Sequence, residues 1–148
     1  MLVTVSADEV AKYGAIAKLW ALVEHLARAP HSIPKEARPL WLIWAYDAEV
    51  NNGGHLQYFH NRGVKDVLET LKELRHIGAD NHAMLLESSW AVVKQAPLSR
   101  VGSLVEYSAL AQARSFSEDS AYYELPDLCD LVVSHNEALL DELVHVQV

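Results

Sequence analysis

A chain of 148 residues has the usual size of one domain, and because half of its residues are hydrophobic it can bury a packed core, which excludes a disordered protein. The single Cys129 cannot form an internal disulfide, and the longest apolar run, Leu40 to Tyr46, is far shorter than the roughly 18 residues that a membrane-spanning helix needs. No secretory signal pattern opens the sequence and the net charge is −8, so we expect a cytoplasmic protein that binds neither nucleic acid nor membranes directly.

Nearly every segment has the period of an α-helix, and strand-like alternation is absent beyond the first few residues. The pattern predicts an all-α, compact, single-domain bundle of about seven to eight helices. A capping box at residues 6–9 opens the first helix, which we expect to reach about residue 29, before two prolines. The second helix, at about 39–50, is apolar nearly all round and is therefore expected to be central, with Trp41 and Trp44 buried on one face.

Gly53 and Gly54 are expected to end the second helix, because residues without a β-carbon adopt positive φ without strain. A short helix then continues to about Asn61. Further helices are predicted at about residues 64–77, 80–96, 102–113 and 126–146.

The negative charge is concentrated near the C-terminal end of the sequence. Residues 1–114 hold 12 acidic and 12 basic side chains, whereas residues 115–148 hold eight acidic side chains and neither Lys nor Arg. Such a segment attracts basic partners, and a solvated acidic helix has the same pattern.

Four carboxylates of the last predicted helix are spaced by three, seven and four residues, which places them in a row on one helix face. The row would be roughly 21 Å long at the helical rise per residue. The opposite side is apolar, so the helix can pack on the core and present its carboxylates. The expected partner-binding residues are these four and three acidic neighbours that precede them: Glu118, Asp119, Glu124, Asp127, Asp130, Glu137 and Asp141.

The stretch "EVNNGGHLQYFHN", residues 49–61, combines the glycine corner with polar and aromatic side chains. In the structural interpretation, Asn51 and Asn52 bond the backbone groups that the helix end leaves free, and Gln57 and Asn61 share one face of the short helix. In the alternative, the cluster is a small polar pocket for a ligand or a partner segment. The candidate residues are Glu49, Asn51, Asn52, Gly53, Gly54, His55, Gln57, Tyr58 and Asn61.

This stretch resembles the signature Glu-x-x-Asn-Gly-Gly-Phe-x-Gln-Tyr-Phe-x-Asn of the DNA-mimic protein family, which is also catalogued as a domain of unknown function. "IGADNHAMLLESSWAVV" and "FSEDSAYYEL" resemble two later segments of that family, so the resemblance covers about residue 41 to the C-terminus. His55 stands where the family usually has Phe, which indicates an altered pocket or a half-exposed ring. The resemblance implies an all-helical, often dimeric protein whose acidic surface imitates DNA phosphates and occupies a DNA-binding protein.

Patterns typical of catalytic or metal sites are missing. The sequence has no His-Glu-x-x-His or Cys/His ligand spacing, and His55 and His60 would lie about 140° apart on a helix. Acidic neighbours disfavour a reactive thiolate at Cys129, and no glycine-rich phosphate loop is present. We therefore expect no enzymatic activity, no bound metal and no cofactor.

These patterns predict a non-enzymatic acidic protein that binds and inhibits a basic DNA-binding protein, such as a transcription regulator. Two alternatives stay open. An immunity-type inhibitor would use the same acidic face against a basic toxin. A small-molecule or metal-binding protein would instead use the pocket around Glu49, Asn52, His55 and Gln57.

Overall fold

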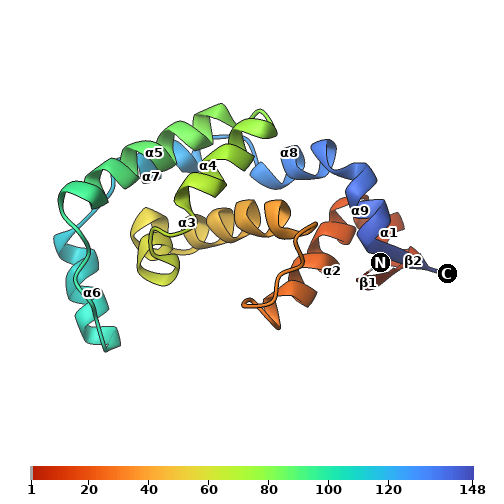
Figure 1. Ribbon diagram of the computed structural model, residues 1–148, viewed down its shortest axis with the longest axis horizontal. Coiled ribbons are helices and arrows are strands. Elements are labelled where there is room, and N and C mark those ends of the chain that lie inside the picture. Colours follow the sequence, from red (N-terminus) through yellow and green to blue (C-terminus); the bar gives the residue numbers. More distant parts are fainter. Residues whose placement is uncertain (1) are drawn as a thin grey trace. The chain divides into compact units, whose positions relative to one another are not determined.

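The computed structural model describes residues 2–148, and within this range it confirms the predicted all-α class, with nine helices and two short strands (Figure 1). The elements form two compact units, one made of the chain up to Trp44 with Asp127–Val148, the other of Ala45–Pro126. None of the helices in the described range is both long and apolar enough to cross a membrane. In chain order the elements are β1 (Val3–Ser6), α1 (Ala7–Tyr13), α2 (Ile16–Ala27), α3 (Arg38–Arg62), α4 (Val67–His76), α5 (Asp80–Gln95), α6 (Leu104–Ala113), α7 (Glu118–Tyr123), α8 (Leu128–His135), α9 (Glu137–Leu143) and β2 (Val144–Gln147).

The first unit begins with the predicted capping box. The Ser6 hydroxyl accepts the Glu9 N–H at 3.2 Å, and the Glu9 carboxylate accepts the Ser6 N–H at 3.3 Å. The single helix expected after it is in fact two, because Gly14 adopts a φ of 72° and ends α1. The second of them, α2, packs inward with a stripe of apolar side chains at helical spacing: Leu19, Leu22, Val23 and Leu26.

The last predicted helix, residues 126–146, is also divided. Asn136 leaves the helical conformation at φ −123° and ψ 23°, and its side-chain amide donates to the Val132 carbonyl at 2.8 Å, which ends α8. After α9 the chain becomes strand β2, whose alternating valines favour extended backbone. β2 pairs in parallel with β1, with Val3 opposite Val144 (Figure 1).

The second unit contains the part of α3 after residue 44 together with α4 to α7. Helices α4 and α5 correspond to the predicted helices at 64–77 and 80–96, and they pack against each other across a turn at Gly78, where φ is 77°. Helix α6, by contrast, has no buried residue. The core of this unit is rich in aromatic rings that contact one another: Tyr46, Tyr58, Phe59, Phe116 and Tyr122.

Trp41 and Trp44 share one face of α3, as predicted, with ring centroids 5.2 Å apart. Their burial differs, because Trp41 is buried and Trp44 is only partly so. We therefore predict that Trp41→Ala lowers the free energy of unfolding by about 3–5 kcal/mol, the usual cost of deleting a buried large aromatic side chain, and that Trp44→Ala costs clearly less. Denaturant titration of both variants measures this, and equal losses would contradict the difference in burial.

Candidate functional site

The glycine corner interrupts α3, as the sequence predicts. Gly53 has φ −157° and ψ 24°, and Gly54 has φ 72° and ψ −175°, so the helix stops and starts again in a new direction. Gly54 is required for two reasons. Its backbone angles strain any residue with a β-carbon, and a β-carbon there would overlap the carboxylate of Asp119 on α7.

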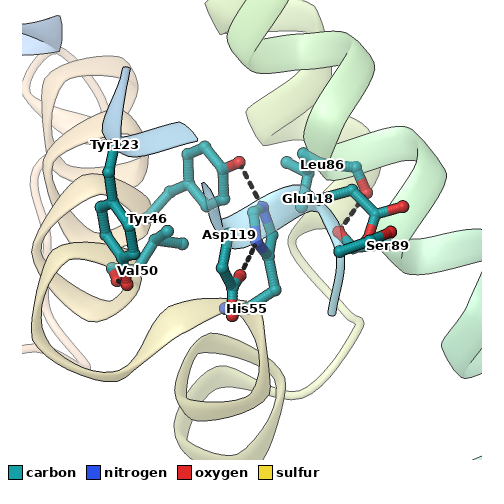
Figure 2. A network of polar contacts seen from close by, with 9 residues as sticks. Tyr46, Val50, His55, Leu86, Ser89, Glu118, Asp119 and Tyr123 are labelled. Carbon is teal, nitrogen blue, oxygen red and sulfur yellow. Dashed lines mark hydrogen bonds and ion pairs between the residues drawn. The ribbon is translucent and has the colours of Figure 1, made fainter. Parts of the chain in front are cut away.

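Asp119 holds the first residue of the restarted helix. Its Oδ1 atom accepts the backbone N–H of His55 at 2.9 Å and the Nδ1–H of the same residue at 2.6 Å (Figure 2). On the other side of the ring, Nε2 accepts the hydroxyl of Tyr46 at 2.8 Å. The side chains of Tyr46 and His55 are fully buried, so the half-exposed ring considered from the sequence is wrong.

Burial determines the protonation of this chain of groups. It lowers the pKa of His55 from its ordinary 6.5, although the hydrogen bond to Asp119 acts in the opposite direction. Burial also raises the pKa of Tyr46 well above 10. At neutral pH, Tyr46 is therefore a protonated donor and His55 a neutral ring with its proton on Nδ1. Because both ring nitrogens are occupied inside the core, the arrangement joins α7 to α3 and offers no exposed base.

Two tyrosines of α7 reinforce this junction. The Tyr123 hydroxyl donates to the Val50 carbonyl at 2.8 Å, just before the interruption of α3 at Gly53 and Gly54. Tyr122 is buried, and its hydroxyl donates to the Asp47 carboxylate. The backbone groups at the corner are thus capped from α7, more than sixty residues away.

The predicted capping by the two asparagines is wrong. The Asn51 side chain donates to Asp47 at 2.9 Å, and the Asn52 side chain donates to Gln57 Oε1 at 3.0 Å, so both bond side chains rather than freed backbone. Aspartate and tyrosine side chains from α7 fill that role. No spacing within the motif could indicate this, because the capping groups come from a distant segment.

The outward side of the corner is organised by Glu49. Its Oε2 accepts the side-chain amides of Gln57 and Asn61, both at 2.8 Å, which confirms that these two residues share a face. Its Oε1 accepts Arg62 Nε at 3.2 Å, and only 13% of the Glu49 side chain is exposed. Arg62 was missed from the sequence, although a cation directly after the motif is the expected counterion for a partly buried carboxylate.

A groove of about 480 Å³ lies beside this network. It is lined by Asn52, Gln57, His60 and Asn61 from α3 and by residues 101–104 and Tyr107 at the start of α6. None of these lining side chains belongs to Lys, Arg, Asp or Glu. His55 is absent from the groove because it points into the core, so the pocket predicted around Glu49, Asn52, His55 and Gln57 is not formed as such. Tyr58 is buried as well and takes no part in it.

The predicted acidic row is not a row. Because the chain leaves the helix at Asn136, Asp130 lies in α8 with Asp127 directly before it, while Glu137 and Asp141 belong to α9. Asp127 caps α8 by accepting the Cys129 N–H at 2.8 Å.

Three of the other predicted partner-binding carboxylates also have internal roles or incomplete exposure. Asp141 forms an ion pair with Lys18, and Asp119 is engaged by His55. Glu118 is only partly exposed. The predicted carboxylates that are exposed without an ion pair in the described structure are Glu124, Asp127, Asp130 and Glu137, of which Asp127 is engaged as the cap of α8. Glu142, which was not predicted, is exposed and unpaired in the same way.

The excess of negative charge lies in the last 34 residues of the sequence, but in the folded protein it is shared between the two units. The first unit has nine acidic and five basic residues and the second has eleven and seven, so each carries a net charge of −4. The acidic end of the sequence contributes to both units, because the chain passes from the second to the first between Pro126 and Asp127.

A comparison with known protein families matches most of the chain. The model of the family described as DMP19-like protein matches residues 31–144, which include the whole motif and all of α7. No curated protein and no solved structure matches the chain.

Gly54 is constrained both by its positive φ and by the nearby carboxylate of Asp119, and this predicts the effect of replacing it on stability. Gly14 has the same φ of 72°, but no atom lies within 4 Å of the position of an added β-carbon. Gly14→Ala therefore measures backbone strain alone, about 1–3 kcal/mol, and we expect Gly54→Ala to lower the free energy of unfolding by at least about 1 kcal/mol more. Urea titration gives both values, and equal losses would show that the approach of Asp119 costs nothing.

The buried imidazole of His55 generates a pH prediction. The pKa of His55 in the folded chain is below its ordinary value of 6.5. Between the lowered pKa and pH 6.5, the unfolded chain therefore binds more protons than the folded chain. The contribution of neutral His55 to stability is therefore fully present above pH 6.5. It is lost as the pH falls from 6.5 through the lowered pKa of the folded chain. The variant His55→Phe carries the residue that the family signature usually has at this position, and it removes the titrating group. The free energy of unfolding of this variant should therefore depend less on pH below 6.5 than that of the parent protein. The other seven histidines are common to both proteins, and identical slopes would contradict the buried neutral ring.

Proposed function

The chain belongs to the DMP19-like protein family, and we propose that it is a non-enzymatic protein that binds a basic DNA-binding protein through exposed carboxylates of α8 and α9. The carboxylates are Asp130, Glu137 and Glu142. Each is exposed, none forms an ion pair in the described structure, and residues 115–148 contain no Lys or Arg. These three exposed carboxylates without an ion pair are the observation that carries the proposal.

The two helices can hold these carboxylates steady because their other sides are anchored in the first unit. Leu128 and Val132 of α8 are buried, as are Leu140 and Leu143 of α9. Carboxylates on packed helices are better ordered than carboxylates on a flexible tail, so they lose less conformational entropy when a partner binds. Their attraction for a basic surface extends over about one Debye length, roughly 8–10 Å at moderate salt, and increases the rate of association.

A basic toxin would be recognised by the same chemistry, so an immunity-type inhibitor is the alternative within this proposal. The identity of the bound protein separates the two. A bound transcription regulator supports the DNA-mimic assignment, and a bound nuclease that is inhibited by the chain supports the immunity assignment.

The test is displacement from DNA. Extract of the source cells is loaded on immobilised duplex DNA, and the parent protein is applied at low salt, with the released proteins identified by mass spectrometry. We expect release of a basic DNA-binding protein, decreasing as salt is added. The variant Asp130→Asn/Glu137→Gln/Glu142→Gln should release at least about tenfold less of it at the same concentration, because the steering and interfacial charges are gone.

The control variant removes three exposed charges elsewhere, Asp8→Asn/Glu36→Gln/Asp80→Asn, and thus has the same net charge. It should release the partner as well as the parent does. Equal loss in both variants would mean that net charge alone matters, and equal release by the parent and the α8–α9 variant would remove these carboxylates from the proposed function.

A further inference from the structure

Strand β1 has an edge without a neighbouring strand. The sheet consists of β1 and β2 alone within the described residues, so the edge of β1 that faces away from β2 presents backbone N–H and C=O groups with no strand to bond. Proteins usually protect such an edge with Lys, Pro or a bulge. The sequence of β1 is Val-Thr-Val-Ser, which has none of these side chains and is protected only by its short length.

A groove of about 530 Å³ lies along this strand. Three successive residues of β1 line it, Val3, Thr4 and Val5, and its other wall comes from α1 and α2. Because successive side chains of a strand point to opposite faces, a cavity that touches three in a row meets the edge of the strand rather than one face. No residue of β2 lines the groove, so it lies on the side of β1 that faces away from β2.

The wall opposite the strand carries two exposed aromatic rings. Trp20 is 46% exposed and Tyr13 is 45% exposed, and the rings meet edge to face with centroids 5.4 Å apart. One ring of the pair, Tyr13, contacts a cation of the chain itself, because Lys12 Nζ lies 4.8 Å from the Tyr13 ring centroid. Trp is the aromatic side chain that attracts a cation most strongly, and a large exposed Trp is typical of the anchor of a protein interface.

The charges of the groove also favour a cation. Glu9 and Glu24 line it together with Arg28, which pairs with Glu24 at 3.0 Å, so Glu9 is the lining carboxylate that forms no ion pair in the described structure.

We propose that this groove binds an extended segment of a partner protein, which adds to β1 as a strand and places a Lys or Arg side chain on Trp20. Main-chain hydrogen bonds to the edge of β1 provide affinity for any extended peptide, and the cation on Trp20, flanked by Glu9 and Glu24, provides selectivity for a basic one. The surface is separate from the carboxylates of α8 and α9, so either proposal can fail without the other.

The probe is a phage-displayed library of random dodecapeptides selected against the full-length protein. Enriched peptides should carry Lys or Arg flanked by residues that favour strands, and a synthetic peptide of the consensus should bind in a fluorescence anisotropy titration. Amide hydrogen exchange locates it. Backbone amides within residues 3–5 that face away from β2 should exchange more slowly with peptide bound, whereas a ligand that touches side chains alone would not protect them.

Trp20→Ala should lower the affinity for the consensus peptide by at least about tenfold, as loss of an interface anchor does. Glu24→Lys should also lower this affinity, because the new Lys repels the cation of the peptide. Leu104→Ala is the control, since Leu104 is an exposed apolar side chain of the second unit, 84% exposed, and its loss should leave binding unchanged.

Three results would overturn the proposal. One is enrichment of no peptide, and another is full binding by Trp20→Ala. The third is a parent protein that forms a dimer in sedimentation analysis and becomes monomeric with Trp20→Ala, because the occupant of the groove is then a second copy of the chain.

Discussion

The second unit depends on one carboxylate. Asp119 accepts two hydrogen bonds from His55, one from the backbone and one from the ring, at the point where α3 starts again after Gly54. A helix start has free N–H groups and a partial positive charge, and a carboxylate satisfies both. Because Asp119 belongs to α7, the same contact that caps the helix also attaches α7 to it. The backbone at Gly54 must leave room for this carboxylate, which explains the glycine better than the turn alone does.

The motif around the corner therefore has two sides with different roles. On the inner side, Tyr46 and His55 are buried, and hydrogen bonds to Tyr46 and to the partly exposed Asp119 occupy both ring nitrogens of His55. On the outer side, Glu49 is held by two amides and the guanidinium of Arg62. Both sides resemble the polar clusters of active sites in composition, yet their hydrogen-bonding capacity is largely used inside the protein. This is the expected behaviour of polar groups placed near a core, which are costly unless they have partners.

The two surfaces proposed for binding lie outside the polar network of the glycine corner, and each attracts a partner by a different kind of interaction. The carboxylates of α8 and α9 act over a distance, and salt weakens them. The edge of β1 acts by short-range hydrogen bonds and by an aromatic contact, which salt affects less. A partner that combined a basic surface with an extended basic segment would be recognised by both, and the two contributions separate experimentally by their dependence on ionic strength.

Local sequence rules account for the features that neighbouring residues decide. The helical period identifies most of the helices, the spacing of Ser6 and Glu9 predicts the capping box, and two adjacent glycines predict the corner. Each of these results from interactions within about one helical turn.

Tertiary structure decided the rest. The break at Asn136 divides the acidic residues between two helices, and the pairing of β1 with β2 joins residues from opposite ends of the sequence. Asp119 looked like a surface acid because its partner, His55, is 64 positions away. The energy of such contacts depends on which segments meet after folding, and a carboxylate has the same local pattern whether it faces a DNA-binding protein or caps a distant helix.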